Sequence, residues 1–197
     1  RSIYGTPEVA TVTAEKCVWL TDVEGVAAAT ISLPENPQRV MVDAVETIYT
    51  INNATAVTMP MTVIAGSQVI LRTTATLSEL TNGGVITVQN ATLDLTTTQL
   101  SGRGQIIAGT GGIVRISAQT LAESTMSFSC EGGKLEVVTT EDFSMPTNRI
   151  PDNCSGLIKE GEGTLYLPPA AMSGTITVND GVLMPTGAIA LKARYFK

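Results

Sequence analysis

The sequence predicts an all-β fold, and more specifically a right-handed parallel β-helix, or β-solenoid, with an N-terminal β cap. Runs of four to six β-branched or aliphatic residues recur along the chain, whereas helical periodicity is hard to find. A unit of strand, polar turn and strand recurs with Gly or Asn at the same place, because a corner needs residues that tolerate a positive φ. Aromatic residues make up only 4% of the 197 residues, so the core must be built from aliphatic side chains, which suits thin stacked sheets.

The spacing of these units favours a solenoid over a β-sandwich. The first apolar residue after each turn recurs every 18 to 30 residues, with a mean step of about 23. A period of about 20 to 30 residues made of short strands is typical of a solenoid, in which each repeat buries its inner face only by stacking on the next. We therefore predict five or six coils. The residues that mark the units are Val69, Leu93, Ile113, Leu135, Leu165 and Leu183.

The chain divides into three predicted parts. Residues 1–60 contain strand-like runs at irregular spacing, with Pro34 and Pro37 between them, and are predicted to form a strand-rich cap over the first open edge. Residues 61–187 form the solenoid repeats. Residues 188–197 end in basic and aromatic residues and are predicted to form an edge strand or tail.

The C-terminal third carries a recognisable pattern. Residues 157–167 read LIKEGEGTLYL, and residues 174–183 read GTITVNDGVL. This segment resembles the autotransporter-associated β-strand repeat, whose units run L-x-K-x-G-x-G-T-L-x-L, a short loop, and G-x-x-x-V-x-x-G-x-L. The resemblance implies a secreted bacterial surface protein whose passenger is a right-handed β-helix, or a fragment of such a passenger. It implies an extracellular stalk or adhesin, and it brings no catalytic residues with it.

Three cysteines are too few for a disulfide-dense scaffold. Cys130 and Cys154 lie 24 residues apart, about one coil, which would place them on adjacent rungs within the distance that a disulfide spans. They are a candidate disulfide, and the loop-entropy model assigns such a bond about 3 kcal/mol. The alternative is two independent buried thiols. Cys17 is expected to be a buried residue of the cap.

Composition excludes several functions. The chain has no His, which removes Ser-His-Asp and Cys-His nucleophiles, HExxH zinc sites and His proton shuttles. A net charge of -6 argues against nucleic acid as a partner. No run of eighteen apolar residues is present, so we expect no membrane span in this chain. Because the chain starts at Arg1 without Met or an apolar leader, we interpret it as a processed or excised segment.

No catalytic, cofactor-binding or metal-binding residue can be named from the sequence. Asp94, Arg115, Lys134 and Glu136 could share an outward face across coils, as the groove of a β-helix carbohydrate-active enzyme would require. They are spread about one per coil among threonines, which favours a solvated wall instead. The turn at residues 159–162 holds one Lys and two Glu, but it lacks the Asp of a calcium-binding repeat, so a solvated turn is expected there.

These observations predict a non-enzymatic structural or adhesin-type β-solenoid, secreted or displayed on a bacterial surface, without cofactors. Its partners would be glycans or host and cell-surface proteins, and it is a candidate homo-oligomer. One alternative is a β-helix polysaccharide lyase or hydrolase, which would gather three or more ionised residues in a groove. The other is a phage or viral fibre segment, which would form obligate trimers.

Overall fold

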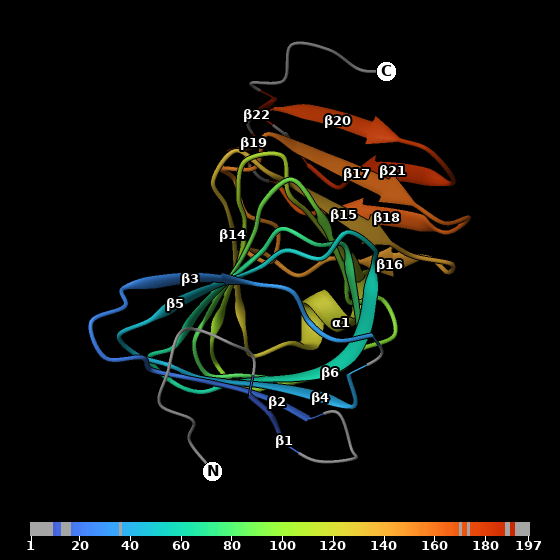
Figure 1. Cartoon of the computed structure of the whole chain (residues 1–197). Helices are drawn as coiled ribbons and strands as arrows, with labels where there is room; N and C mark the ends of the chain where they lie inside the picture. The colour runs from blue at the N-terminus through green and yellow to red at the C-terminus, as the bar shows by residue number, and fades with distance from the viewer. Residues whose placement is uncertain are drawn as a thin grey trace.

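The protein is a β-solenoid of about eight turns, and its described part consists mostly of parallel strands with one short helix (Figure 1). The computed structural model describes residues 10–12, 17–35, 37–169, 171–172, 174–187 and 190–191. The predicted fold class, a parallel β-solenoid built from stacked short strands, is confirmed.

The longest sheet, which we call sheet A, runs the whole length of the solenoid. Its main path follows the order β1-β2-β4-β6-β8-β10-β13-β15-β17-β20, with β11 pairing β8 at the side. All its pairs are parallel except β1 with β2, which is antiparallel. The strands are β1 (Ala10–Val12), β2 (Cys17–Thr21), β4 (Arg39–Asp43), β6 (Val57–Val63), β8 (Ala75–Asn82), β10 (Thr92–Asp94), β11 (Gln99–Ser101), β13 (Ile113–Ser117), β15 (Lys134–Val138), β17 (Gly156–Glu160) and β20 (Thr175–Val178).

The sheets that accompany sheet A differ between the N-terminal and the C-terminal coils. Sheet B is parallel and covers the N-terminal coils, whereas sheet C, also parallel, accompanies the C-terminal ones. Figure 1 shows β3 and β5 far from β16, β18 and β21, which lie near the C-terminal coils. Sheet B contains β3 (Ala28–Ile31), β5 (Ile48–Ile51), β7 (Gln68–Leu71), β9 (Val85–Val88), β12 (Gln105–Ala108) and β14 (Ser127–Cys130). Sheet C contains β16 (Phe143–Ser144), β18 (Thr164–Leu167) and β21 (Val182–Pro185), and β19 (Ala171–Met172) pairs β22 (Ala190–Leu191).

The core is a set of aliphatic ladders that run along the solenoid. In sheet A, Leu93 pairs in register with Val114, Val114 with Leu135, and Leu135 with Leu157. All four side chains are buried, and Ile176 continues the ladder. Because side chains alternate across a strand, every second residue enters this core and its neighbours face outward. Leu93 is buried beside the more exposed Asp94, and Leu165 beside the more exposed Tyr166.

Glycines form corners where one coil passes close over another. Gly161 has a φ of 80°, and a Cβ there would lie 2.5 Å from the carbonyl oxygen of Thr139 in the preceding coil. Gly181, with a φ of 69°, occupies the same place one coil later, where a Cβ would lie 2.4 Å from the carbonyl oxygen of Gly161. Only glycine combines this backbone conformation with so close an approach.

The N-terminal coils use side chains as well as glycines at their corners. The carboxylate of Asp22 accepts hydrogen bonds from the backbone amides of residues 45–47, one coil later, at 3.1, 2.7 and 2.8 Å. Asn53 bonds the backbone of Leu33 in both directions, accepting from its N–H at 2.9 Å and donating to its C=O at 2.8 Å. These polar side chains fix the position of one coil on the next.

The solenoid starts earlier than the sequence predicts. Residues 17–60, expected as part of the cap, already form coils in which β2, β4 and β6 pair in parallel. The cap in the described part of the chain is the single strand β1, which lies antiparallel on β2. The turn number therefore rises from the predicted five or six to about eight. Of the predicted C-terminal part, residues 188–197, only residues 190–191 lie within the described chain.

The six marker residues of the repeat do not form one ladder. Val69 lies in sheet B, Leu93, Ile113 and Leu135 in sheet A, and the other two in sheet C. The two longest steps of the sequence pattern therefore connect marker residues that lie in different sheets. Within sheet A the true step between paired residues is 18 to 22 residues.

Candidate functional site

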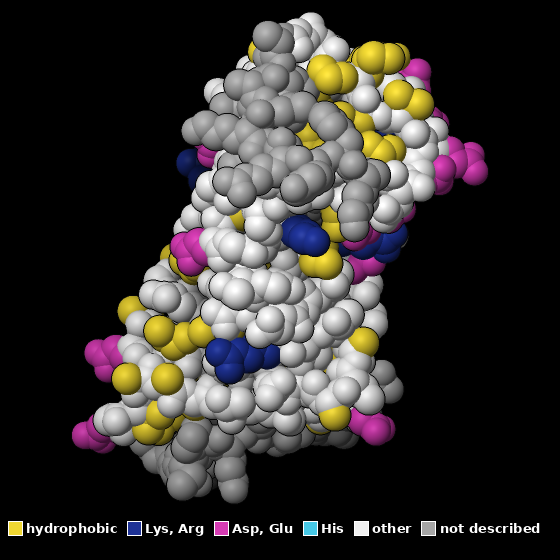
Figure 2. All heavy atoms as spheres, turned by 90° about the horizontal axis from the view of Figure 1, so that it is seen from above, with side chains coloured by type: hydrophobic (Ala, Val, Ile, Leu, Met, Phe, Trp, Pro, Cys, Tyr) yellow, Lys and Arg dark blue, Asp and Glu magenta, His cyan; other side chains and the backbone are white. Residues whose placement is uncertain are grey.

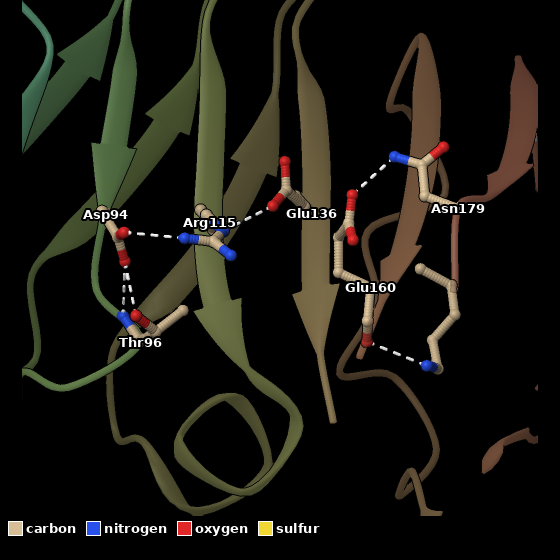
Figure 3. Close-up of polar contacts among 7 residues, drawn as sticks. Asp94, Thr96, Arg115, Glu136, Glu160 and Asn179 are labelled. Carbon is tan, nitrogen blue, oxygen red and sulfur yellow. Dashed lines mark hydrogen bonds and ion pairs between the residues drawn. The ribbon is translucent and has the colours of Figure 1, made fainter. Parts of the chain in front are cut away.

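A row of three charged residues crosses consecutive coils on the outward face of sheet A (Figure 3). Asp94 on β10 pairs in register with Arg115 on β13, and Arg115 with Glu136 on β15. The Arg115 guanidinium bonds Oδ2 of Asp94 at 3.0 Å through Nη1 and Oε1 of Glu136 at 2.5 Å through Nε. The structure thus joins three of the four charged candidates named from the sequence. The fourth, Lys134, is exposed and outside this network.

The ionised forms of Asp94 and Arg115 are favoured by their surroundings. Burial favours the neutral form of Asp94, but hydrogen bonds from the N–H and hydroxyl of Thr96 at 2.9 and 2.7 Å, together with Arg115, outweigh it and lower the pKa of Asp94. For Arg115, burial opposes the charge, and bonds to Glu136 and Asp94 more than compensate, which raises its pKa. A carboxylate with a lowered pKa is a poor proton donor near neutral pH, so Asp94 is unsuited to general acid catalysis.

The outward face of sheet A continues from this row into a groove, which we call the α1 groove. It lies between the start of α1 (Ala118–Glu123) and residues 138–143, and has a volume of about 280 Å³. Ser117 and Val138 pair in register two residues beyond Arg115 and Glu136, so they share the outward face. The lining includes Ser117, Gln119, Thr140, Glu141, Asp142 and Phe143.

Local interactions hold both sides of the α1 groove. Ser117 caps α1, since its hydroxyl accepts from the backbone N–H of Thr120 at 3.1 Å, and Leu121 anchors the helix in the core. On the other side, the carboxylate of Asp142 accepts from the backbone N–H of Thr164 at 2.9 Å. This bond and one from the Thr164 hydroxyl lower the pKa of Asp142. The sequence prediction missed the groove, although a serine before Ala-Gln-Thr-Leu-Ala-Glu is a helix-start pattern.

Lys159 is buried, contrary to the solvated turn expected at residues 159–162. Its ammonium donates to the carbonyl oxygens of Glu160 at 2.8 Å, of Gly161, and of Asp180 in the next coil at 3.1 Å. Burial lowers the pKa of Lys159, and the nearby carboxylates of Asp180 and Glu160 only partly oppose this effect. Glu160 faces outward, where its Oε1 accepts from Asn179 at 2.5 Å (Figure 3). This lysine therefore holds two turns together.

The structure contains the Cys130–Cys154 disulfide, with Cα atoms 4.7 Å apart on adjacent coils. Asn153 reinforces the connection, since it accepts from the N–H of Cys130 at 3.3 Å and donates to its C=O at 2.7 Å. Cys17 is a free thiol on β2 and is half-buried, rather than buried in a cap as expected. Among the residues that the structure describes, no group of three or more His, Cys, Asp or Glu could hold a metal ion.

No family model, curated protein or solved structure matches this chain. The resemblance of residues 157–183 to the autotransporter-associated repeat therefore stays a prediction. Within the described ranges α1 has only six residues, and no helix there is long and apolar enough to cross a membrane.

Proposed function

We propose that this protein is a non-enzymatic structural or adhesin-type β-solenoid that is secreted or displayed on a bacterial cell surface. The observation that carries the proposal is the combination of an unbroken aliphatic core along about eight coils with an outward row of charges, Asp94, Arg115 and Glu136, that are paired with each other. Such a body is a stiff spacer, because each coil is held to the next by strand pairing on sheet A and by buried side chains. The outward faces of its sheets are then the surface that contacts a partner.

The composition of that surface suits weak, polar contacts with glycans or surface proteins. On the face shown in Figure 2 the charged side chains are few, and most of the described surface is uncharged polar side chains and backbone, with hydrophobic side chains among them. Sheets of this kind offer repeated hydroxyl and amide groups at a spacing of about 4.8 Å. A row of such groups can engage an extended ligand through many modest hydrogen bonds.

The disulfide supports an extracellular location. Disulfides persist in oxidising compartments and are rare in the cytosol of most organisms. Cys130 and Cys154 link adjacent coils within the solenoid body, so the bond serves stability. A secreted protein would benefit from this link where proteases are present.

A β-helix polysaccharide lyase or hydrolase is the second candidate. The α1 groove favours it, because Glu141 and Asp142 place two carboxyl groups in one concave site. Against it, the lowered pKa of Asp142 removes one of the two as a proton donor near neutral pH.

Binding and cleavage assays on the same preparation distinguish the candidates. The purified protein is applied to a glycan array and to bacterial and host cell surfaces, and incubated with the polysaccharides that bind. We expect retention of glycans or cells without new reducing ends or unsaturated products. Cleavage of any bound polysaccharide would overturn the non-enzymatic proposal, and absence of binding to every glycan and surface would overturn the adhesive part of it.

A further inference from the structure

If the protein is adhesive as proposed above, one place on its wall should accommodate a defined ligand, and we propose that the α1 groove binds a sugar ring that carries a free amine. The groove is a hollow whose lining residues include one aromatic, Phe143, several with hydroxyl or amide groups, and two acidic ones, Glu141 and Asp142. These are the groups that would recognise a hexosamine unit of a glycan.

The size and apolar part of the groove fit a single ring. A volume of about 280 Å³ lies at the low end of ligand sites, so it holds one sugar unit rather than a long segment. Phe143 lines the groove and is half-buried, packed against the core on one side. Packing against the core holds this side chain in position, and its exposed part is the apolar surface that the groove can offer to the C–H face of a sugar.

The polar part of the groove still has unused hydrogen-bonding groups. The Ser117 hydroxyl is used by the helix cap, and the Thr139 hydroxyl donates to the carbonyl oxygen of Glu141. By contrast, the side chains of Thr140 and Glu141 are exposed and have no hydrogen-bond or ion-pair partner among the described residues. Gln119 donates to Glu123 at 3.0 Å and keeps its carbonyl oxygen for a ligand. Sugar hydroxyls and an ammonium group match these acceptors.

Charge selects the kind of sugar. The lining residues include two acidic ones, Glu141 and Asp142, and no Lys or Arg. The Asp142 carboxylate accepts from the backbone N–H of Thr164, which leaves Glu141 as the acidic side chain for a ligand. Arg115, on the same strand as Ser117, is already paired with Asp94 and Glu136. An anionic groove without a free cation attracts an ammonium group and repels uronates and sulfated sugars.

Binding of defined tetrasaccharides tests the assignment. The probe is a tetramer of β-1,4-linked glucosamine, used at low ionic strength and at a pH where its amines are protonated. Its binding is measured by titration calorimetry and by the shifts of backbone amide NMR signals. The comparison ligands are its fully N-acetylated form, tetragalacturonate and tetralysine. The variant Glu141→Gln removes one charge from the groove, and Glu131→Gln removes one from an exposed loop after β14 as the matched control.

We expect the glucosamine tetramer to shift amides of residues 117–120 and 138–143 and to bind about fivefold more tightly than the N-acetylated form, which is the upper end of what one exposed ion pair allows. Glu141→Gln should lose about fivefold in affinity and Glu131→Gln should lose none, and 0.5 M salt should abolish most of the difference by screening, since the Debye length there falls to about 4 Å. Phe143→Leu, which keeps an apolar side chain but removes the ring, should also weaken binding.

Three results would overturn the inference: equal affinity in the two Gln variants, shifts confined to another part of the wall, or tetralysine binding as tightly as the sugar. The last would assign the groove to a basic protein segment. Glycan binding that ignores the groove variants would leave the adhesive function intact while removing this site, so the two proposals fail separately.

Discussion

Replacing Lys159 with Met tests the role of the buried ammonium in joining two turns of the solenoid. The Lys159 side chain is fully buried, and its ammonium donates to three carbonyl oxygens, those of Glu160, Gly161 and Asp180. Met has a similar length and keeps the contacts of the aliphatic stem, but it cannot donate. The substitution therefore removes three hydrogen bonds and leaves the surrounding packing nearly unchanged.

The expected loss follows from those three acceptors. A carbonyl that loses its partner inside a protein costs about 1–3 kcal/mol, and the lower end applies because Glu160 and Gly161 are half-buried and Asp180 is exposed, so water can replace part of each bond. Removing a buried charge returns part of this loss. We expect the free energy of unfolding to fall by about 2–3 kcal/mol, which corresponds to a decrease in Tm of about 4–12 °C for a chain of this size.

The assay compares Lys159→Met with Lys134→Met, a matched control on the neighbouring strand β15 whose lysine is exposed. Urea unfolding followed by circular dichroism gives the free energies, and amide hydrogen exchange localises the change. The control should stay within about 0.5 kcal/mol of the wild type. In Lys159→Met, exchange should accelerate first at residues 159–163 and 179–181. Equal stability of the two variants would refute the idea that this lysine holds the turns together.

Three further predictions concern other links between coils. Replacing Cys130 and Cys154 by Ser should lower the free energy of unfolding by about 3 kcal/mol in denaturant titrations, whereas replacing the third cysteine should not. Burial favours the neutral form of Asp22, but hydrogen bonds from three backbone amides outweigh burial and lower the pKa of Asp22. The ionised carboxylate therefore stabilises the fold above its ordinary pKa of 3.8, and this stabilisation is lost as the pH falls through the pKa of the folded state. Between pH 7 and pH 3, the free energy of unfolding of Asp22→Asn should not show this loss. Gly161→Ala should lower Tm more than Gly132→Ala. Both glycines have a positive φ, but only at position 161 would a Cβ lie 2.5 Å from a backbone atom. Equal decreases in Tm for the two variants would show that this close contact does not determine the loss.

The fold class could be predicted from the sequence because the corner glycines can be recognised in it. The start of the solenoid could not be predicted, because other residues help to form the corners there. Corners such as Gly161 recur at coil spacing and reveal the C-terminal coils. In the N-terminal coils, Asp22 and Asn53 do comparable work by bonding the backbone of a neighbouring coil. Isolated Asp and Asn residues are common in loops, so their function here becomes apparent only when the coils are stacked.

The candidate site was only partly predictable. Asp94, Arg115 and Glu136 are separated by 21 residues each, and a repeat of that length places them side by side, but the length itself varies between 18 and 22 in sheet A. A row of ion pairs can therefore be assigned only once the register is known. The α1 groove is harder still, since it depends on how a short helix inserted after β13 lies against a loop from the next coil.

The end of sheet B shows how side chains replace strand pairing where a wall of the solenoid stops. β14 is the last strand of this sheet, and no strand of the next coil pairs with it in the described chain. In its place, Asn153 bonds the backbone of Cys130 in both directions, as a paired strand would, and the adjacent Cys154 adds a covalent bond. An unpaired edge would otherwise expose backbone donors and acceptors. The disulfide therefore lies where the pairing of sheet B ends, and it joins two coils that are otherwise connected by sheet A and by side chains.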